Sequence, residues 1–346
     1  MDAHGEVVAY LRRRIPELLG LSVHLVSALS ANVWRMQVEG GRELVAKYQI
    51  FGPLSQGKAY DLLEVERDVL AVLCTAGCPV PRLLAIDAEA FFVFFESVGR
   101  ETLDDWVQEQ RGDTTPLLEQ IVRGQCAIDA TLTQHGHLFE PRVAPGVDRQ
   151  ALVGAWHEVG KRAQWAAQAL RRHLRMGPLP AAAHAALVAM NVYLAQRCPV
   201  LGSSDYNARN IVITGAEPTA SFIEFAKLGW DWTERRLVQY TTSMGSGREG
   251  ALMLSLLDER AVCLYAEVSG RVDSIRALDC HHVFFMLNGA AALCEALEQP
   301  EREWAQALLA SWAKPSERLR LFAKELAKPL SADGDAVVLR AAFQGM

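Results

Sequence analysis

The pattern of apolar residues changes at Gly99, and this change restricts the chain to a two-part design. Before Gly99, short runs rich in valine, leucine and phenylalanine alternate with turn residues, which is typical of antiparallel strands. After it, apolar residues recur at helical spacing over long segments. We therefore expect an α+β, two-lobed protein. A small antiparallel β-sheet lobe is predicted over residues 1–98 and a larger, mainly helical lobe over residues 99–346, with a cleft between them.

In the first lobe we expect five strands, a short amphipathic helix and one principal helix. The short helix is predicted over residues 5–19 and the principal helix over residues 59–75. Glu66 falls on the apolar stripe of the principal helix, where a solvent-facing acid would not be needed. Gly77 ends that helix. The strands are predicted at residues 22–29, 32–39, 43–50, 82–87 and 91–96.

In the second lobe, helical periodicity is interrupted by one β-rich stretch, over residues 211–225. No internal repeat or low-complexity linker divides this lobe further. The helices are predicted at residues 101–110, 115–135, 149–175, 180–196, 248–268, 273–298, 302–312, 315–328 and 333–344.

Composition argues against several classes of protein. The formal net charge is −6 over 346 residues, without the basic footprint of a nucleic-acid-binding protein. No apolar stretch reaches membrane-spanning length, and the first residues lack the pattern of a signal peptide. The seven cysteines are odd in number and lie in apolar surroundings. We expect a cytoplasmic monomer or homodimer with reduced thiols, no nucleic-acid partner and no membrane association.

One loop has the composition of a phosphoryl-transfer site. Asp205 and Asn210 lie five residues apart, directly before the apolar run Ile211–Ile213. In such a loop the aspartate accepts the proton of an attacking hydroxyl, and the asparagine holds a metal on the phosphates. Glu224, on a second predicted strand, supplies a further acid. Because Asp and Asn are also common turn residues, an ordinary turn is the alternative interpretation of this spacing.

A second motif suggests a different phosphate site. Residues 52–58 match G-x-x-x-x-G-K, in which backbone amides cradle phosphate and Lys58 would reach it. That loop also needs Ser or Thr at the next position to hold Mg²⁺, and Ala59 stands there. The preceding strand belongs to a series of hairpins and does not begin an alternating βαβ pattern. We therefore predict a connecting loop over residues 52–58.

Several further motifs stand in the order expected for a known family. A short turn separates the first two predicted strands, a lysine lies on the third, an acid lies on the principal helix, and an apolar–acidic segment follows the fifth strand. They are Ser30–Arg35, Lys47 within Leu-Val-Ala-Lys, Glu66 thirteen residues before Pro79, and Phe95–Val98.

With the Asp205 loop, these motifs resemble the aminoglycoside phosphotransferase and choline kinase-like family, which has a protein-kinase-like fold. The resemblance extends over residues 23–240 and implies an enzyme that uses ATP and Mg²⁺. It also implies a role for each motif residue. These roles are Asn32 in the phosphate-covering turn, Lys47 on the α- and β-phosphates, Glu66 as its ion-pair partner, Phe95 as gatekeeper, the backbone of Glu96 and Val98 on adenine, Asp205 as catalytic base, and Asn210 and Glu224 as metal ligands.

The chain departs from the family pattern at three places. The usual His-Gly-Asp is Ser203-Ser204-Asp205, so the histidine that braces the loop is lost. The usual metal-binding Asp is Glu224, and Lys227 lies close enough in sequence to neutralise it. Residues 235–238 read Arg-Arg-Leu-Val, where the family often has an Asp before Leu-Ala.

Two functions follow from this pattern. The first is an ATP-dependent small-molecule kinase that phosphorylates a hydroxyl of an aminoglycoside-like, amino-alcohol, nucleoside or sugar acceptor, as in antibiotic modification. The second is a pseudokinase-like protein that binds nucleotide or ligand without transfer. Aromatic residues mixed with acids would suit a cationic or amphipathic acceptor. The candidate lining residues are Trp156, His157, Trp165, Asp231, Trp232, Asp258, Glu259, His281, His282 and Asn288.

Overall fold

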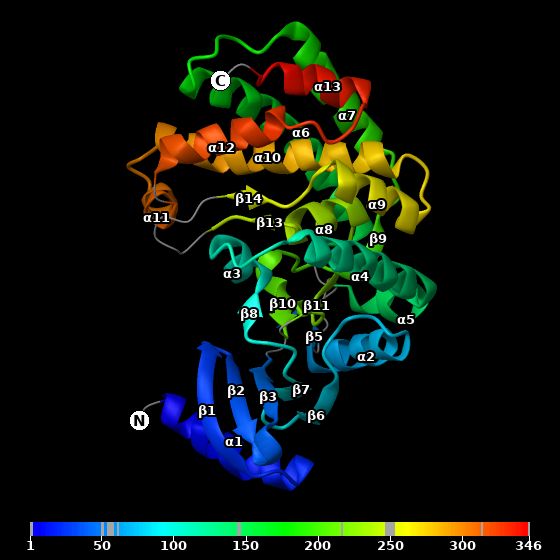
Figure 1. Ribbon diagram of the computed structural model, residues 1–346, viewed down its shortest axis with the longest axis vertical. Coiled ribbons are helices and arrows are strands. Elements are labelled where there is room, and N and C mark those ends of the chain that lie inside the picture. Colours follow the sequence, from blue (N-terminus) through cyan, green and yellow to red (C-terminus); the bar gives the residue numbers. More distant parts are fainter. Residues whose placement is uncertain are drawn as a thin grey trace.

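The computed structural model describes residues 3–49, 52–53, 59–60, 62–143, 147–215, 217–245, 253–312 and 314–344. These residues form two lobes stacked along the long axis of the molecule, with helix α1 in the sheet lobe and helix α13 at the opposite end (Figure 1). The predicted α+β, two-lobed fold is confirmed. The division of the chain at residue 98 stays a prediction.

The sheet lobe is built on an antiparallel sheet with the strand order β1-β2-β3-β7-β6. In its centre, Lys47 of β3 lies opposite Val33 of β2 on one side and Val93 of β7 on the other. The five predicted strands are confirmed. They are β1 (Val23–Ser30), β2 (Val33–Val38), β3 (Glu43–Tyr48), β6 (Leu83–Asp87) and β7 (Phe92–Glu96).

Strand β7 is apolar because both of its faces are buried. Phe92 and Phe94 pack on one side with Leu11 of α1 (Ala3–Leu19). Val93 and Phe95 face the other way and join a core that extends into the helical lobe. Successive side chains of a strand point to opposite faces, so an unbroken apolar run indicates burial on both.

Helix α2 (Leu62–Thr75) covers the inner side of the sheet, and Glu66 is buried within it at 2% exposure. The predicted start of this helix at residue 59 is wrong, because Ala59–Tyr60 form the short strand β5, which pairs with β4 (Gly52–Pro53). Most of the G-x-x-x-x-G-K match, including Lys58, lies outside the described residues.

Most helices of the second lobe begin and end within a few residues of their predicted bounds. Two helices, at Gly136–Phe139 and Thr233–Tyr240, were not predicted. The predicted helix at 248–268 is wrong in its first part as far as the described residues show: Leu254–Ser255 form strand β14, and residues 248–252 lie outside the described residues. The helix begins at Glu259, where the Asp258 side chain caps it by accepting from the Ala261 N–H at 2.8 Å. The helices are α3 (Leu103–Gln108), α4 (Thr115–Gln134), α5 (Gly136–Phe139), α6 (Arg149–His173), α7 (Ala181–Ala195), α8 (Thr233–Tyr240), α9 (Glu259–Ser269), α10 (Ser274–Glu298), α11 (Glu303–Ser311), α12 (Pro315–Ala327) and α13 (Gly334–Ala341).

The β-structure of this lobe is more extensive than the predicted stretch at 211–225. Strands β10 (Ile211–Thr214) and β11 (Thr219–Phe222) pair within that stretch, but β11 ends two residues before Glu224. Strand β9 (Val200–Ser203) pairs with β12 (Leu228–Asp231), so the Asp205 loop lies between two short ladders. The remaining strands are β8 (Glu101–Thr102), which pairs with β10, and β13 (Thr242–Ser243), which pairs with β14.

One hydrophobic core is shared by the two lobes. Leu70 of α2, Phe95 of β7, Ile121 of α4 and Phe222 of β11 all belong to it. A backbone hydrogen bond of 2.8 Å from the Phe222 N–H to the Pro79 carbonyl also joins the lobes. A second core lies in the helical lobe, mainly between α6, α7, α10, α12 and α13. None of the described helices is long and apolar enough to cross a membrane.

Candidate active site

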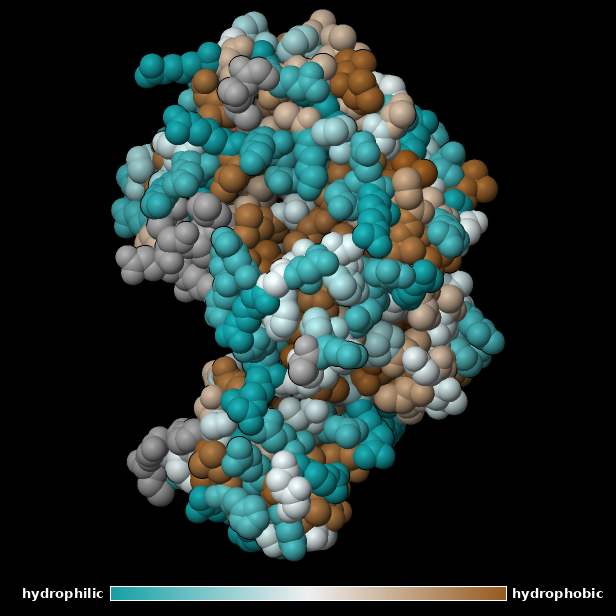
Figure 2. Space-filling view, viewed as in Figure 1, coloured by the Kyte–Doolittle hydropathy of each residue, from teal (hydrophilic) through white to brown (hydrophobic). Residues whose placement is uncertain are grey.

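A cleft of about 510 Å³ lies between the two lobes, where the outline of the molecule is indented (Figure 2). The sheet lobe contributes Val33, Val45 and Lys47 to its walls, and the helical lobe contributes Arg209 and Glu224. Of the residues assigned to the nucleotide from sequence, those that line the cleft are Lys47, Glu66, Phe95, Glu96 and Val98.

Lys47 joins two carboxylates inside the cleft. Its Nζ lies 3.1 Å from Oε1 of Glu66 and 2.7 Å from Oε2 of Glu224. Burial opposes the charge of the amine, but the two carboxylates outweigh it, so the pKa of Lys47 is raised. Burial raises the pKa of Glu66 as well, and Lys47 opposes that change while Glu224 adds to it. The predicted Lys47–Glu66 partners are therefore in contact, together with Glu224.

Gln49 supports this group, and sequence analysis did not single it out. Its Nε2 donates to Oε2 of Glu66, so the buried carboxylate is held by an amide as well as by Lys47. Lys47 lies on β3 and Gln49 directly follows the strand. Side chains two residues apart in an extended segment share a face. This spacing was the available signal.

Asp205 is held by two amides of its own loop. Asn207 and Asn210 each donate through Nδ2 to Oδ1 of Asp205 at 3.1 Å, and Asn210 also donates to its carbonyl at 2.8 Å. Asn210 is buried whereas Asp205 is exposed. The carboxylate is thus fixed in place and open to solvent, as a base that meets a substrate hydroxyl must be. The roles of Asp205 and Asn210 stay predictions.

Ser203 stands where the family has a histidine that braces the loop, and its hydroxyl braces the loop here. Its hydroxyl donates to the carbonyl of Glu224 at 2.6 Å and accepts from the N–H of Asp205 at 3.1 Å. The buried Ser203 side chain therefore connects the backbone of Asp205 to the backbone of Glu224. The loop is therefore braced even though the histidine of the family pattern is absent.

Arg236 lies beneath the same loop, at the position where the family often has an Asp. It is 1% exposed and donates to the carbonyls of Ser203, Val200 and Gly229 at 3.0–3.1 Å. Gly202 makes room for it, because a Cβ there would lie 2.6 Å from the guanidinium carbon. An arginine that donates to carbonyls thus holds the β9 and β12 ladder together.

The prediction that Glu224 lies on a strand is wrong. Glu224 lies past the end of β11, with its backbone in the left-handed region at φ 69°. A non-glycine residue there costs on the order of 1–2 kcal/mol, which the contacts of its carboxylate and carbonyl offset. Lys227 is exposed, so the structure assigns the neutralisation of Glu224 to Lys47 instead.

A metal ion would find suitable donors here. The Ile223 N–H donates to the Asn210 carbonyl at 3.0 Å, which sets the two predicted ligand segments side by side. Glu224 offers a carboxylate and Asn210 an amide oxygen, and Mg²⁺ is commonly held by one or two such oxygens together with phosphates. The described residues contain no cluster of three or more His, Cys, Asp or Glu side chains suited to a metal.

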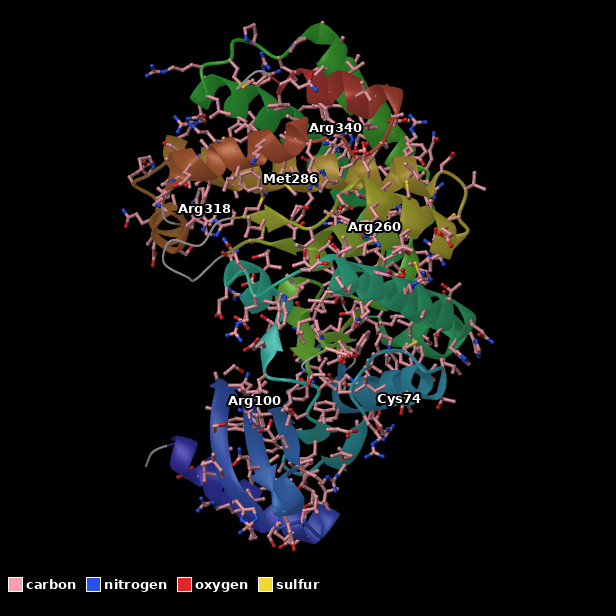
Figure 3. The ribbon with its side chains drawn as sticks, in the orientation of Figure 1. Cys74, Arg100, Arg260, Met286, Arg318 and Arg340 are labelled. Carbon is pink, nitrogen blue, oxygen red and sulfur yellow. The ribbon has the colours of Figure 1, made fainter. Side chains whose placement is uncertain are left out.

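The end of the cleft that was predicted to hold adenine lies at the connection between the lobes. Gly99, at φ 139°, approaches the Ile213 carbonyl so closely that a Cβ would lie 2.3 Å from the oxygen. Arg100, labelled at this connection in Figure 3, forms an ion pair with Glu43. Asn32 is exposed in the β1–β2 turn, and it is the neighbouring Ser30 and Val33 that line the cleft.

The predicted acceptor residues are only partly brought together. Trp156, His281 and Asn288 line a second, smaller pocket in the helical lobe. Asp258 caps α9, and His282 faces Glu325 at 3.9 Å. The mixture of aromatic residues and acids expected for an acceptor site does not occur in this pocket. Among its described lining residues, which are Trp156, Val159, Arg162, Arg235, Gln239, His281, Phe284, Phe285, Asn288 and Gly289, no carboxylate occurs.

Comparison with solved structures decides the fold. The GDP complex of wild-type aminoglycoside 2′-phosphotransferase-IIIa matches with a TM-score of 0.53 at 12% identity, over 91% of this chain and 99% of that one. The chain has a kinase-like fold. Ethanolamine kinase from Plasmodium vivax matches with a TM-score of 0.50 at 11% identity, over 92% of this chain and 91% of that one. No family model and no curated protein matches the sequence.

Proposed function

We propose that this kinase-like protein is an ATP-dependent phosphotransferase that acts on the hydroxyl of a small molecule. The observation that carries the proposal is the contact of Ser203 with both Asp205 and Glu224. It joins a solvent-accessible base to a cleft acid that is already paired with Lys47. The solved structures with this fold include an aminoglycoside phosphotransferase and an ethanolamine kinase, which supports the same reaction class.

In the proposed reaction the acceptor oxygen forms a bond to the γ-phosphorus while the bond from that phosphorus to the leaving oxygen breaks. The proton of the acceptor hydroxyl passes to Asp205, and ADP leaves with the bonding electron pair. Lys47 holds the α- and β-phosphates, and Glu66 orients it. Asn210 and Glu224 would hold Mg²⁺, which neutralises phosphate charge when bound. Positioning and charge neutralisation supply most of the acceleration.

A pseudokinase-like binding protein is the second candidate. The observation in its favour is the 2.7 Å contact between Lys47 and Glu224, because the predicted metal ligand is engaged by the lysine that would hold the phosphates. In this alternative the nucleotide or ligand binds beside that ion pair and no transfer follows.

Thermal-shift titration with ATP, with and without Mg²⁺, tests the cleft. At a hundred times the dissociation constant, ATP should stabilise the wild type by about 2.7 kcal/mol. We expect Lys47→Ala to abolish the shift. Lys227→Ala is the matched control and should retain it, because Lys227 is exposed. An equal shift in both variants would contradict the nucleotide site.

Formation of ADP with a panel of hydroxyl acceptors separates the two candidates. For a kinase, Asp205→Asn should lower turnover by roughly two to four powers of ten, the usual contribution of a general base, while ATP binding is kept. Full turnover in Asp205→Asn would refute the assignment of the base. Nucleotide binding that ignores Mg²⁺, with no ADP formed from any acceptor, would favour the pseudokinase.

A further inference from the structure

The outward face of helix α7 is as apolar as its inward face. The helix carries no Asp, Glu, Lys or Arg. Leu187, Met190 and Leu194 pack inward, in the core of the helical lobe. A helix that is apolar all round is normally buried on all sides. One side of α7 nevertheless lies on the surface of the described structure, and its exposed residues are all alanine or valine: Ala181, Ala182, Ala185, Val188, Ala189, Val192 and Ala195.

Helix α13 continues this surface. It packs directly on α7, and both helices lie in the part of the helical lobe that is remote from the cleft (Figure 1). Val337 and Val338 of α13 are exposed at 47% and 41%. The charged residues of α13 do not interrupt the surface, because Arg340 is buried and Asp335 pairs with Arg276 of α10. The exposed residues of α7, together with Val337 and Val338, form what we call the α7/α13 face.

Exposed apolar side chains are concentrated here. Figure 2 shows apolar surface over α13 at this end of the molecule. Contiguous apolar patches larger than a few hundred Å² are rare on monomers and mark interaction sites. Of the eleven large apolar side chains that are exposed among the described residues, six lie on the α7/α13 face or just beyond the end of α7: Val188, Val192, Val272, Ile275, Val337 and Val338.

The start of α7 is positively charged. Beside it lies a groove of about 1020 Å³, which Pro180 and Ala341 of α13 help to line. Arg175 lines this groove, is exposed, and forms no ion pair within the described part of the chain. Among the described lining residues no Asp or Glu occurs, whereas four are cationic: Arg171, Arg175, Arg320 and Lys324.

The end of α7 is negatively charged. The hydroxyl of Tyr193 donates to the carbonyl of Asp273 at 3.2 Å, which places Asp273 beside the last turn of the helix. Asp273 is exposed, and its carboxylate has no ion-pair partner among the residues that the structure describes. Arg276, which stacks on Tyr193, is shared by two acids, Asp333 and Asp335. The other arginines at this end are directed inward, Arg197 toward Glu234 and Arg271 to the hydroxyl of Thr233.

A second copy of this chain matches all of these features. A two-fold axis pairs a surface with itself. With the axis near Val188, at the middle of α7, the two α7 helices are antiparallel and their apolar faces meet. The positive start of each helix then lies against the negative end of the other, and the two helix dipoles are opposed, which is also favourable. A parallel pair would place Arg175 beside Arg175.

The size of the face indicates a reversible dimer. A helix of 15 residues is about 22 Å long, and two packed helices are roughly 20 Å wide. The face therefore covers on the order of 450 Å² on each copy, below the roughly 800 Å² of a standard interface. We therefore expect the two copies to dissociate at micromolar concentration.

We propose that the α7/α13 face is a homodimer interface, in which two antiparallel α7 helices meet and Arg175 of each copy faces Asp273 of the other. The cleft between the lobes lies away from this face and stays open in both copies (Figure 1). The dimer does not depend on the proposed phosphotransfer.

Analytical ultracentrifugation from low micromolar to several hundred micromolar protein tests the dimer. The wild type should approach twice the mass of the chain as its concentration rises. Val188→Glu places two like charges near the axis and should weaken association by about a hundredfold. Leu138→Glu is the matched control, because Leu138 is also exposed but lies on α5, and this variant should associate as the wild type does. Melting followed by circular dichroism verifies that each variant is folded.

A charge exchange tests the antiparallel pairing. Asp273→Arg and Arg175→Asp each bring like charges together twice in the dimer, and each should weaken association by about tenfold. The variant that carries both substitutions restores unlike charges and should associate within about threefold of the wild type. Arg175 and Asp273 both lie in the left-handed region, at φ 58° and 59°, so the backbone cost of the exchange is similar at the two sites.

The proposal would be overturned by a wild type that stays monomeric at every concentration, by a dimer that Val188→Glu leaves intact, or by a double variant that associates no better than the single variants. A mass above that of the dimer would also overturn it, because an interface with two-fold symmetry is closed. Monomeric protein that instead sediments with phosphatidylcholine vesicles, and no longer does so as Val188→Glu, would assign the face to a lipid surface.

Discussion

Replacement of Arg236 by methionine should destabilise the protein more than any exposed arginine would. The guanidinium is 1% exposed and satisfies the carbonyls of Ser203, Val200 and Gly229. It also lies 3.8 Å from the buried carboxylate of Asp129. Removal of one partner of such a buried pair leaves an uncompensated charge, and the loss is about 3–5 kcal/mol. A stability of roughly 5–15 kcal/mol would leave most of the variant folded at 25 °C.

The pH dependence of this loss can be given a sign. Burial raises the pKa of Asp129, and Arg236 opposes that increase. Without Arg236 the pKa of Asp129 in the folded state rises further above its unfolded value. An acid of this kind stabilises the folded state below its unfolded pKa, and the contribution is lost as the pH rises through the folded pKa. The deficit of Arg236→Met should therefore shrink between pH 7.5 and pH 5.5.

Urea unfolding followed by circular dichroism at both pH values measures this effect. Arg123→Met is the control, because Arg123 is exposed and its ion-pair partner among the described residues is Glu119 in the preceding turn of α4, so a loss below about 0.5 kcal/mol is expected. Asp129→Asn, added to Arg236→Met, should recover part of the loss. A deficit no larger than that of Arg123→Met, or one that grows as the pH falls, would refute the reasoning.

Two further predictions concern residues beside the cleft. Ser203→Ala should slow turnover roughly tenfold, because the loss of bonds worth about 1 kcal/mol each loosens the catalytic loop, whereas Ser204→Ala should leave turnover unchanged; equal rates in the two would show that Ser203 does not brace the loop. Gly99→Ala should lower the melting temperature more than Gly112→Ala, since the two glycines share φ near 140° but only Gly99 would press a Cβ against the Ile213 carbonyl. Equal shifts would mean that the crowding relaxes freely.

Periodicity in the sequence was sufficient to place Lys47 on a strand and Glu66 on the apolar stripe of a helix. Their pairing, which the structure contains, came from the family resemblance. The unbroken apolar run of β7 likewise fits a strand that is buried on both faces. These features depend on local spacing, which the sequence contains directly.

The remaining parts of the site depend on contacts between distant segments. Nothing local to Ser203 shows that Glu224, twenty-one residues later, will turn into the left-handed region and present its carbonyl. Arg236 was noted only as a departure from the family pattern, and its bonds to the carbonyls of Ser203, Val200 and Gly229 come from segments that are distant in the sequence. Strands β9 and β12 are four residues long, too short for an alternating pattern to be distinguished from a loop.

The core shared by the two lobes affects the order in which the protein can fold during synthesis. Helix α2 leaves the ribosome well before α4. The leucines of α2 are buried in the same core as Ile121 of α4. Until α4 and β11 have emerged, part of the apolar surface of the sheet lobe stays open to water, and such surface favours aggregation. The core that the two lobes share draws on residues from Leu62 to Leu330, so its interior is complete only when most of the helical lobe has been made.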